Sequence, residues 1–149
     1  MPLKPEQIVI SGATGGIGRS LVTAALERWP EARIYAIGRD KAKLEALGLA
    51  CGTPPRLFLL PFDLTHKDEA ESFAARLKED GNRVDLVFHT IGVLSGGGRG
   101  PEKSLREIDP EVLADTFRIN VSSALWLATV LKPFFRHPSP SVFIASHRI

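Results

Sequence analysis

A glycine-rich segment, VISGATGGIGRS, joins an apolar run to a helical pattern near the start of the sequence. It places Gly12, Gly16 and Gly18 in the spacing G-x-x-x-G-x-G. A turn of this kind between a strand and a helix aims backbone N–H groups and the positive helix end at a phosphate, and glycines let the ligand come close to the backbone. The segment therefore predicts a nucleotide-binding strand, turn and helix. The alternative is a tight glycine turn without a ligand.

A nucleoside triphosphate loop fits this segment less well than a dinucleotide turn does. The P-loop requires the pattern G-x-x-x-x-G-K-[ST]. Here Ala13 stands where the first glycine of that pattern would be, and Arg19 stands where its lysine would be. The segment therefore favours a dinucleotide over a nucleoside triphosphate.

Short apolar runs alternate with helical patterns along the rest of the chain. Strands are expected at residues 7–10, 33–37, 56–60, 84–88 and 141–145. Helices are expected in between, including one from 41 to 47 that ends at Gly48, one that ends at Gly81, and a long one from Pro110 to about Arg136. Strands that are apolar throughout and alternate with helices indicate a parallel sheet covered on both faces. We therefore predict one α/β domain over residues 1–149, a doubly wound, Rossmann-like parallel sheet of about five strands.

Composition limits the partners that this domain can have. The 19 Lys and Arg residues are nearly balanced by 17 Asp and Glu residues, which argues against a nucleic-acid partner. No apolar run is long enough to span a bilayer, so no membrane partner is expected. Cys51 is the only cysteine, as is common in a reducing compartment. These features predict a cytoplasmic protein, and no metal site is predicted.

The end of the second predicted strand bears on the choice of dinucleotide. NAD sites usually carry an acidic residue here for the ribose hydroxyls, whereas an arginine accommodates the 2′-phosphate of NADP. The sequence YAIGRD has Arg39 where the acid would be. Asp40 could serve as a late ribose-binding acid, or it could cap the following helix. We predict NADP(H) in preference to NAD(H).

Three further segments complete a known pattern. FDLT follows the third predicted strand, HTIG follows the fourth, and INVSSALWLATVL, which contains Asn120, lies in the long helix. Together with S-G-x-x-x-G-x-G, these segments resemble the short-chain dehydrogenase/reductase family. GPEKSLREI and the final SHRI are most similar to the branch related to bacterial C-factor, a cell–cell signalling protein.

The resemblance implies an NADP(H)-dependent oxidoreductase acting on a small-molecule carbonyl/alcohol pair. It implies that the cofactor is bound by a set of residues along the first four strands: Gly12, Thr14, Gly16, Ile17 and Gly18 at the pyrophosphate, Asp63 and Leu64 at the adenine, and Gly92 at the ribose. Asp63 could instead simply cap a turn, and Gly92 could simply open a loop. The family usually has Asn-Asn-Ala-Gly where this chain has HTIG, so only the glycine of that motif is present.

Two residues are candidates for the catalytic site. Asn120 falls on a helical stripe predicted to be buried, together with Leu113, Phe117, Ala124, Ala128 and Leu131. On spacing alone, its amide could be satisfied by nearby backbone carbonyls. The resemblance implies instead that it holds a water in a proton relay, and that Ser146, at the tip of the last predicted strand, binds the substrate carbonyl.

The family's Tyr-x-x-x-Lys segment is missing from these 149 residues. Tyr35 is the only tyrosine, and it lies in the second predicted strand with Arg39 four residues later. We therefore expect an incomplete chain that ends before the catalytic tyrosine, whose exposed edge strand and uncovered apolar helix lead to a homo-oligomer. The alternative is a complete, non-catalytic protein that binds nucleotides or acts in C-factor-like cell–cell signalling.

Overall fold

The computed structural model describes residues 4–80, 83–95, 102–135 and 143–145. Five parallel strands form one sheet, and their order across it is β3-β2-β1-β4-β5. The strands are β1 (Gln7–Ser11), β2 (Arg33–Ile37), β3 (Leu57–Leu60), β4 (Leu86–His89) and β5 (Phe143–Ala145). This confirms the predicted doubly wound α/β fold.

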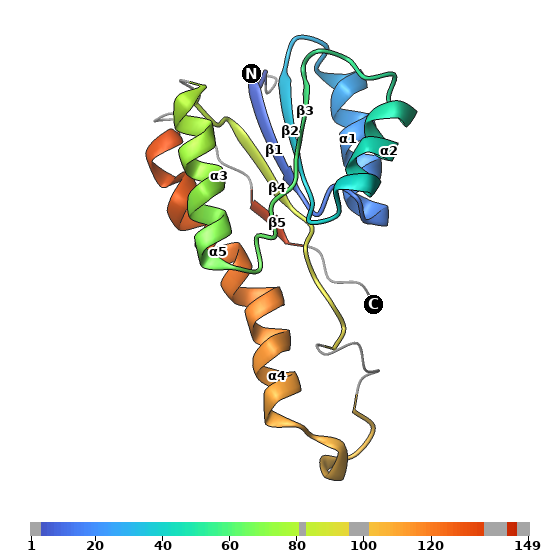
Figure 1. Cartoon of the computed structure of the whole chain (residues 1–149), viewed down its shortest axis with the longest axis vertical. Coiled ribbons are helices and arrows are strands. Elements are labelled where there is room, and N and C mark those ends of the chain that lie inside the picture. Colours follow the sequence, from blue (N-terminus) through green and yellow to red (C-terminus); the bar gives the residue numbers. More distant parts are fainter. Residues whose placement is uncertain (1–3, 81–82, 96–101, 136–142, 146–149) are drawn as a thin grey trace.

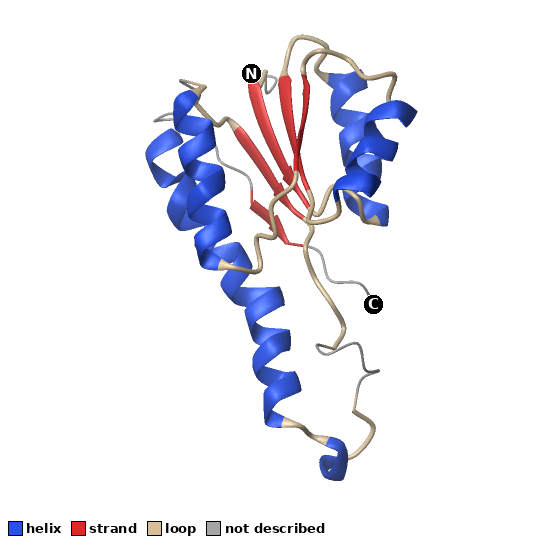
Figure 2. Ribbon diagram, viewed as in Figure 1, coloured by secondary structure: helices blue, strands red, loops and turns tan. Residues whose placement is uncertain are grey.

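Helices cover both faces of the sheet (Figures 1 and 2). One layer holds α1 (Gly16–Arg28) and α2 (Lys41–Ala50), and the other holds α3 (Lys67–Glu79) and α5 (Ser123–Leu131). The remaining helical segments are η1 (Leu105–Glu107), α4 (Pro110–Phe117), the π-helical turn η2 (Arg118–Ser122) and η3 (Lys132–Phe134). None of the helices among the described residues is both long and apolar enough to cross a membrane.

The alternation of side chains along each strand divides the core into two parts. Ile8 and Ile10 of β1 pack toward α1 and α2, where they meet Val22 and Leu44. Val9, between them, faces the other helix layer and packs in a second cluster that includes Phe73 of α3 and Leu127 of α5. Both clusters are closed to solvent. The apolar character of the central strand follows from this two-sided burial.

The second helix runs further than its sequence predicts. Gly48 was expected to end it, but α2 continues through Gly48 to Ala50. A Cβ atom at position 48 would lie 2.7 Å from Cδ1 of Leu59 on β3. The prediction was wrong because this glycine allows the helix to pack closely on a strand instead of ending it. The predicted end of the next helix, Gly81, lies outside the described residues.

The long helix differs from its prediction in both its length and its buried face. Instead of reaching Arg136, regular helix ends at Leu131, because Pro133 lacks the N–H that would continue it. Leu113 and Phe117 were predicted to be buried but are exposed, because α4 extends past the carboxyl ends of the strands (Figure 1). Leu131 is buried as predicted, and the rest of the buried face is made by Val112, Ser123 and Leu127.

Arg56 ties the end of α1 to the start of β3. Its guanidinium donates to the carbonyl of Leu26 at 2.7 Å and to those of Trp29 and Ala32 at 3.2 Å each. Carbonyls at a helix C-terminus lack intrahelical donors, so a cation there is stabilising.

We expect Arg56→Ala to lower the free energy of unfolding by about 1.5 kcal/mol, because three carbonyls lose a charged donor. Urea unfolding followed by circular dichroism measures the change. Arg28→Ala removes an exposed arginine from the last turn of the same helix and is the matched control, expected to change stability by less than about 0.5 kcal/mol. Equal effects of the two substitutions would contradict this role of Arg56.

Candidate functional site

The order of the strands creates a crevice at one end of the sheet. From β1 the chain continues outward through β2 and β3, and then returns to the other side of β1 with β4. In open parallel sheets, ligands bind at the carboxyl ends of the strands where the direction reverses in this way. The loops after β1 and β4 therefore border the expected binding position.

The glycine turn after β1 is locked against the end of β4. Gly12 has φ +73°, a left-handed conformation that favours glycine, and a Cβ atom there would lie 2.7 Å from Oγ1 of Thr90. The Thr90 hydroxyl donates to the carbonyls of Ser11 at 2.7 Å and Gly12 at 3.3 Å. At position 18, a Cβ atom would lie 2.1 Å from the Gly12 carbonyl oxygen. The turn can therefore close only with glycines at 12 and 18.

The amino-terminal end of α1 is open. A Cβ atom at position 16 would meet no atom within 4 Å. The N-cap residue is Gly15, no side chain caps the helix, and its first turn has no acidic residue. The first N–H groups of a helix lack intrahelical partners and carry the positive end of the dipole. An anion could therefore reach this end without displacing a side chain.

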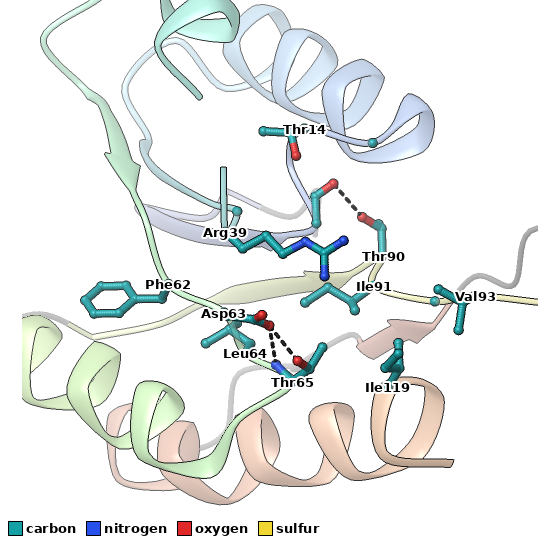
Figure 3. A pocket seen from close by; sticks show the side chains of 14 residues that line it. Thr14, Arg39, Phe62, Asp63, Leu64, Thr65, Thr90, Ile91, Val93 and Ile119 are labelled. Atoms are coloured by element: carbon teal, nitrogen blue, oxygen red, sulfur yellow. Dashed lines mark hydrogen bonds between the residues drawn. The ribbon is translucent and has the colours of Figure 1, made fainter. Parts of the chain in front are cut away.

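A cavity of about 240 Å³ lies at the carboxyl ends of the strands (Figure 3). Its walls come from the loops after β1, β2, β3 and β4 and from η2. The residues are Gly12, Thr14, Gly15, Gly38, Arg39, Phe62, Asp63, Leu64, Thr65, Thr90, Ile91, Gly92, Val93 and Ile119. Apolar side chains and a small number of polar groups are typical of a site for an organic ligand.

Two charged side chains reach this cavity. Arg39 extends from the end of β2 toward the centre of the cavity, between Thr14 and Asp63 (Figure 3). Burial alone would raise the pKa of Asp63, but two hydrogen bonds from Thr65 and the charges of His66 and Arg39 hold it below its usual range. Asp63 is therefore ionised at neutral pH. It closes a turn, as one interpretation of its motif predicted, and also lines the cavity.

Asp40 caps the helix that follows. Its carboxylate accepts the Lys43 amide at 3.0 Å, in the N-cap position of α2. Asp40 does not line the cavity. Of its two interpretations, the helix cap is confirmed, and Arg39 is the charged residue that β2 delivers to the cavity.

Asn120 holds the loop that follows β4. Its amide group accepts the Val93 N–H at 2.8 Å and donates to the Val93 carbonyl at 2.7 Å. The side chain is half-buried and lies in the π-helical turn η2. The backbone contact that spacing alone suggested is therefore present. Single π-helical turns occur frequently at functional sites.

The sequence pattern of the short chain dehydrogenase family matches residues 6–147. The chain belongs to this family. It is 27% identical over 135 residues to the uncharacterized oxidoreductase YciK of Escherichia coli, which covers 88% of this chain and 51% of YciK. The chain therefore spans about half of that relative. The narrower likeness to C-factor stays a prediction.

Solved structures of a carbonyl reductase and of RhlG share this architecture. A carbonyl reductase from Pseudomonas aeruginosa is 30% identical, with a TM-score of 0.75 over 95% of this chain and 59% of the reductase. RhlG of the same organism, solved as an NADP active-site complex, is 21% identical, with a TM-score of 0.78 over 96% of this chain and 54% of RhlG.

The structure brings together most of the residues that the sequence indicated as a cofactor site. Gly12, Thr14, Arg39, Asp63, Leu64 and Gly92 all line the one cavity. Gly16, Ile17 and Gly18 begin the adjacent α1, and Asn120 stands behind the lining residue Val93. Ser146 lies outside the described residues. Tyr35 is buried in β2 and stacks on Phe58, with ring centroids 5.1 Å apart.

Several lining residues were not predicted. Phe62 and Thr65 flank Asp63 and Leu64, and Thr90 and Ile91 precede Gly92, so their positions after the ends of strands could have indicated them. Ile119 does not follow a strand; it opens the segment INVSSALWLATVL and lies in the π-helical turn, which the sequence pattern did not predict. Among the described residues, no three His, Cys, Asp or Glu side chains gather as a metal site.

Proposed function

We propose that this chain forms the NADP(H)-binding part of an oxidoreductase that interconverts a small-molecule carbonyl and its alcohol. The observation that carries the proposal is the Arg39 side chain in the cavity, beside an uncapped helix end and a glycine turn. The membership in the short chain dehydrogenase family supports the reaction class. A carbonyl reductase and an NADP complex among the similar structures support it further.

The residues of the cavity fit the proposed cofactor. Gly16 leaves space for a pyrophosphate at the positive end of α1, and Thr14 stands beside it. Arg39 would pair with the 2′-phosphate, since a guanidinium binds phosphate through charge-assisted hydrogen bonds. Asp63 and Leu64 would flank the adenine, and Gly92 would line the ribose.

The chemistry of the bound nicotinamide is transfer of a hydride to or from the substrate. In the proposed site, Asn120 orients the loop that borders the cavity and would hold a water in a proton relay. Ser146 would bind the substrate carbonyl. Tyr35 has no part in this chemistry, because it is enclosed in the core, where burial raises the pKa of its phenol, as does the nearby Asp80. A cytoplasmic location stays a prediction of the sequence.

We expect Arg39→Ala to weaken NADPH binding about tenfold and NADH binding less than about twofold, because only NADPH carries the 2′-phosphate. Fluorescence titration with the two cofactors measures both affinities. Lys41→Ala is the matched control. Lys41 is two residues after Arg39, and its substitution also removes one positive charge, but the Lys41 side chain does not line the cavity. Equal weakening of both cofactors by Arg39→Ala would contradict the preference for NADP(H).

We also propose that the chain forms a homo-oligomer through the helical stretch from α4 to α5, which begins beyond the carboxyl ends of the strands. Leu113, Phe117, Val121 and Leu125 recur every fourth residue, and they are 49%, 58%, 43% and 62% exposed. An exposed apolar stripe of this kind favours contact with a second, equivalent stripe.

We expect Phe117→Ser combined with Leu125→Ser to weaken self-association at least about tenfold, because the stripe loses its two most exposed side chains. Sedimentation equilibrium measures the association constant. The paired control Glu111→Ser with Lys132→Ser changes exposed polar positions near the two ends of the same helical stretch. A wild-type chain that stays monomeric at high concentration would contradict the proposal.

A further inference from the structure

His89 is a fully buried imidazole at the carboxyl end of β4, and the proposed function gives it no role. It pairs in register with Ser11 on β1 and follows Val87 by two residues. Because side chains alternate along a strand, His89 faces the same helix layer as Val87, which packs with Leu127 of α5. Its ring therefore lies between the strand that leads into the glycine turn and the helix that carries Asn120.

The ring is held by two hydroxyl groups. Nδ1 lies 2.8 Å from Oγ of Ser11, and Nε2 lies 3.1 Å from Oγ of Ser123. The Ser123 hydroxyl donates its proton to the Ile119 carbonyl at 2.5 Å, so it accepts from His89. His89 therefore carries its proton on Nε2, and Nδ1 accepts from Ser11, whose hydroxyl lies farther, at 3.4 Å, from its other acceptor, the Phe88 carbonyl. Burial also lowers the pKa of His89 to about 4, in agreement with this neutral ring.

Ser123 is the first residue of α5 and directly follows the π-helical turn. Its backbone N–H bonds the Arg118 carbonyl five residues back, as a π-helix requires. In an α-helix, this N–H would instead donate to the carbonyl four residues back, that of Ile119. Here the Ser123 hydroxyl donates to the Ile119 carbonyl. The side chain thus substitutes for the backbone donor where the helix widens, and His89 fixes that side chain from the other side.

The widened turn leads directly to the cavity. Asn120, within it, binds the N–H and the carbonyl of Val93, at 2.8 and 2.7 Å. Val93 and Ile119 both line the cavity. A continuous set of contacts therefore runs from His89 through Ser123 to Asn120 and the loop after β4.

We propose that His89 is a positioning residue for the cofactor site: by donating to Ser123, it maintains the π-helical turn that presents Asn120 to Val93. The expected influence of His89 on cofactor affinity rests on the proposed function. Its influence on the hydrogen bonds between Asn120 and Val93 does not, because these bonds are present in the free chain. The bond to Ser11 joins the ring to β1 but does not contribute to this positioning.

Two substitutions separate the two bonds. In His89→Gln, the side-chain amide can place a donor near the position of Nε2, which preserves the contact with Ser123. In His89→Asn, the shorter side chain can place an acceptor near the position of Nδ1, which preserves only the contact with Ser11. Both variants are neutral and polar, so they differ mainly in which bond they retain.

The first measurement is hydrogen exchange at the Val93 amide in the free chain, followed by NMR. We expect His89→Asn to speed this exchange at least about tenfold, while His89→Gln stays within about threefold of the wild type. The NADPH affinity, measured by titration, is expected to fall about fivefold in the Asn variant and to be restored in the Gln variant. If no NADPH binds to the wild type, the proposed function fails, and the Val93 exchange still tests His89.

Ser123→Ala and Ser11→Ala repeat the comparison without changing the ring, in case a substitution at His89 prevents folding. Ser123→Ala is expected to speed Val93 exchange as His89→Asn does, and Ser11→Ala is not. The proposal would be overturned if the Val93 amide exchanged equally fast in His89→Asn and His89→Gln, or in Ser123→Ala and Ser11→Ala. Faster amide exchange spread evenly over β1 and β4 would also overturn it. Those outcomes would make His89 only a part of the core.

Discussion

Gly18→Ala is expected to lower the free energy of unfolding by about 4 kcal/mol, well beyond the loss expected for Arg56→Ala. The added Cβ would lie 2.1 Å from the Gly12 carbonyl oxygen, 2.7 Å from its carbon and 2.9 Å from Cα of Ala13. All three atoms belong to the backbone of the glycine turn, so no side-chain rotation can relieve the overlap. The turn or the start of α1 must shift, and the geometry proposed to bind the cofactor phosphates is lost with it.

Gly16→Ala is the matched control for this prediction. Position 16 lies in the same helical turn, but a Cβ atom there would meet nothing within 4 Å. Alanine favours helix over glycine, so stability is expected to stay equal or to rise by up to about 1 kcal/mol. Urea unfolding of the two variants measures the difference. A Gly18→Ala variant as stable as Gly16→Ala would contradict the packing described for the turn.

The second large effect is a loss of stability in mild acid that depends on His89. Burial lowers the pKa of this imidazole from 6.5 to about 4 in the folded chain. Below pH 6.5 the unfolded chain therefore binds a proton that the folded chain does not, so stability falls as the pH falls. The difference between the two pKa values corresponds to roughly 3 kcal/mol, lost between pH 6.5 and pH 4.

Urea unfolding at several pH values between 4 and 7 tests this. His89→Asn is expected to remove most of the pH dependence in that range, whatever its stability at pH 7. Asp63, whose pKa is lowered, contributes stability that is lost at still lower pH, so the two windows are distinct. Identical slopes for the wild type and His89→Asn would refute the assignment.

The sequence predicted the sheet well because local signals and the fold agree there. Each strand is a short apolar run, and the residues that follow β1 to β4 line the cavity or lie beside it, so the motifs at 12–18, 39, 63–64 and 92 meet at one end of the sheet. Parallel strands with helical connections bring their carboxyl ends together. The motifs could therefore be assigned to one cavity without knowledge of the side-chain contacts.

The long helix could not be predicted to the same extent. A uniform period of 3.6 residues does not foresee a π-helical turn, and the predicted buried stripe misplaced Leu113 and Phe117. The same turn brings Ile119 to the cavity and allows Ser123 to meet His89. The contact between His89 and Ser123 joins residues 34 positions apart, and nothing in the local pattern indicates it.

NADPH titration of the isotope-labelled chain, followed by backbone amide NMR signals, tests the central proposal most directly. We predict saturable binding of one cofactor per chain, with the largest signal changes at residues 12–16, 39, 63–65 and 91–93. Saturable binding with changes concentrated elsewhere, or no saturable binding by a folded chain, would contradict the assignment of this cavity to NADP(H).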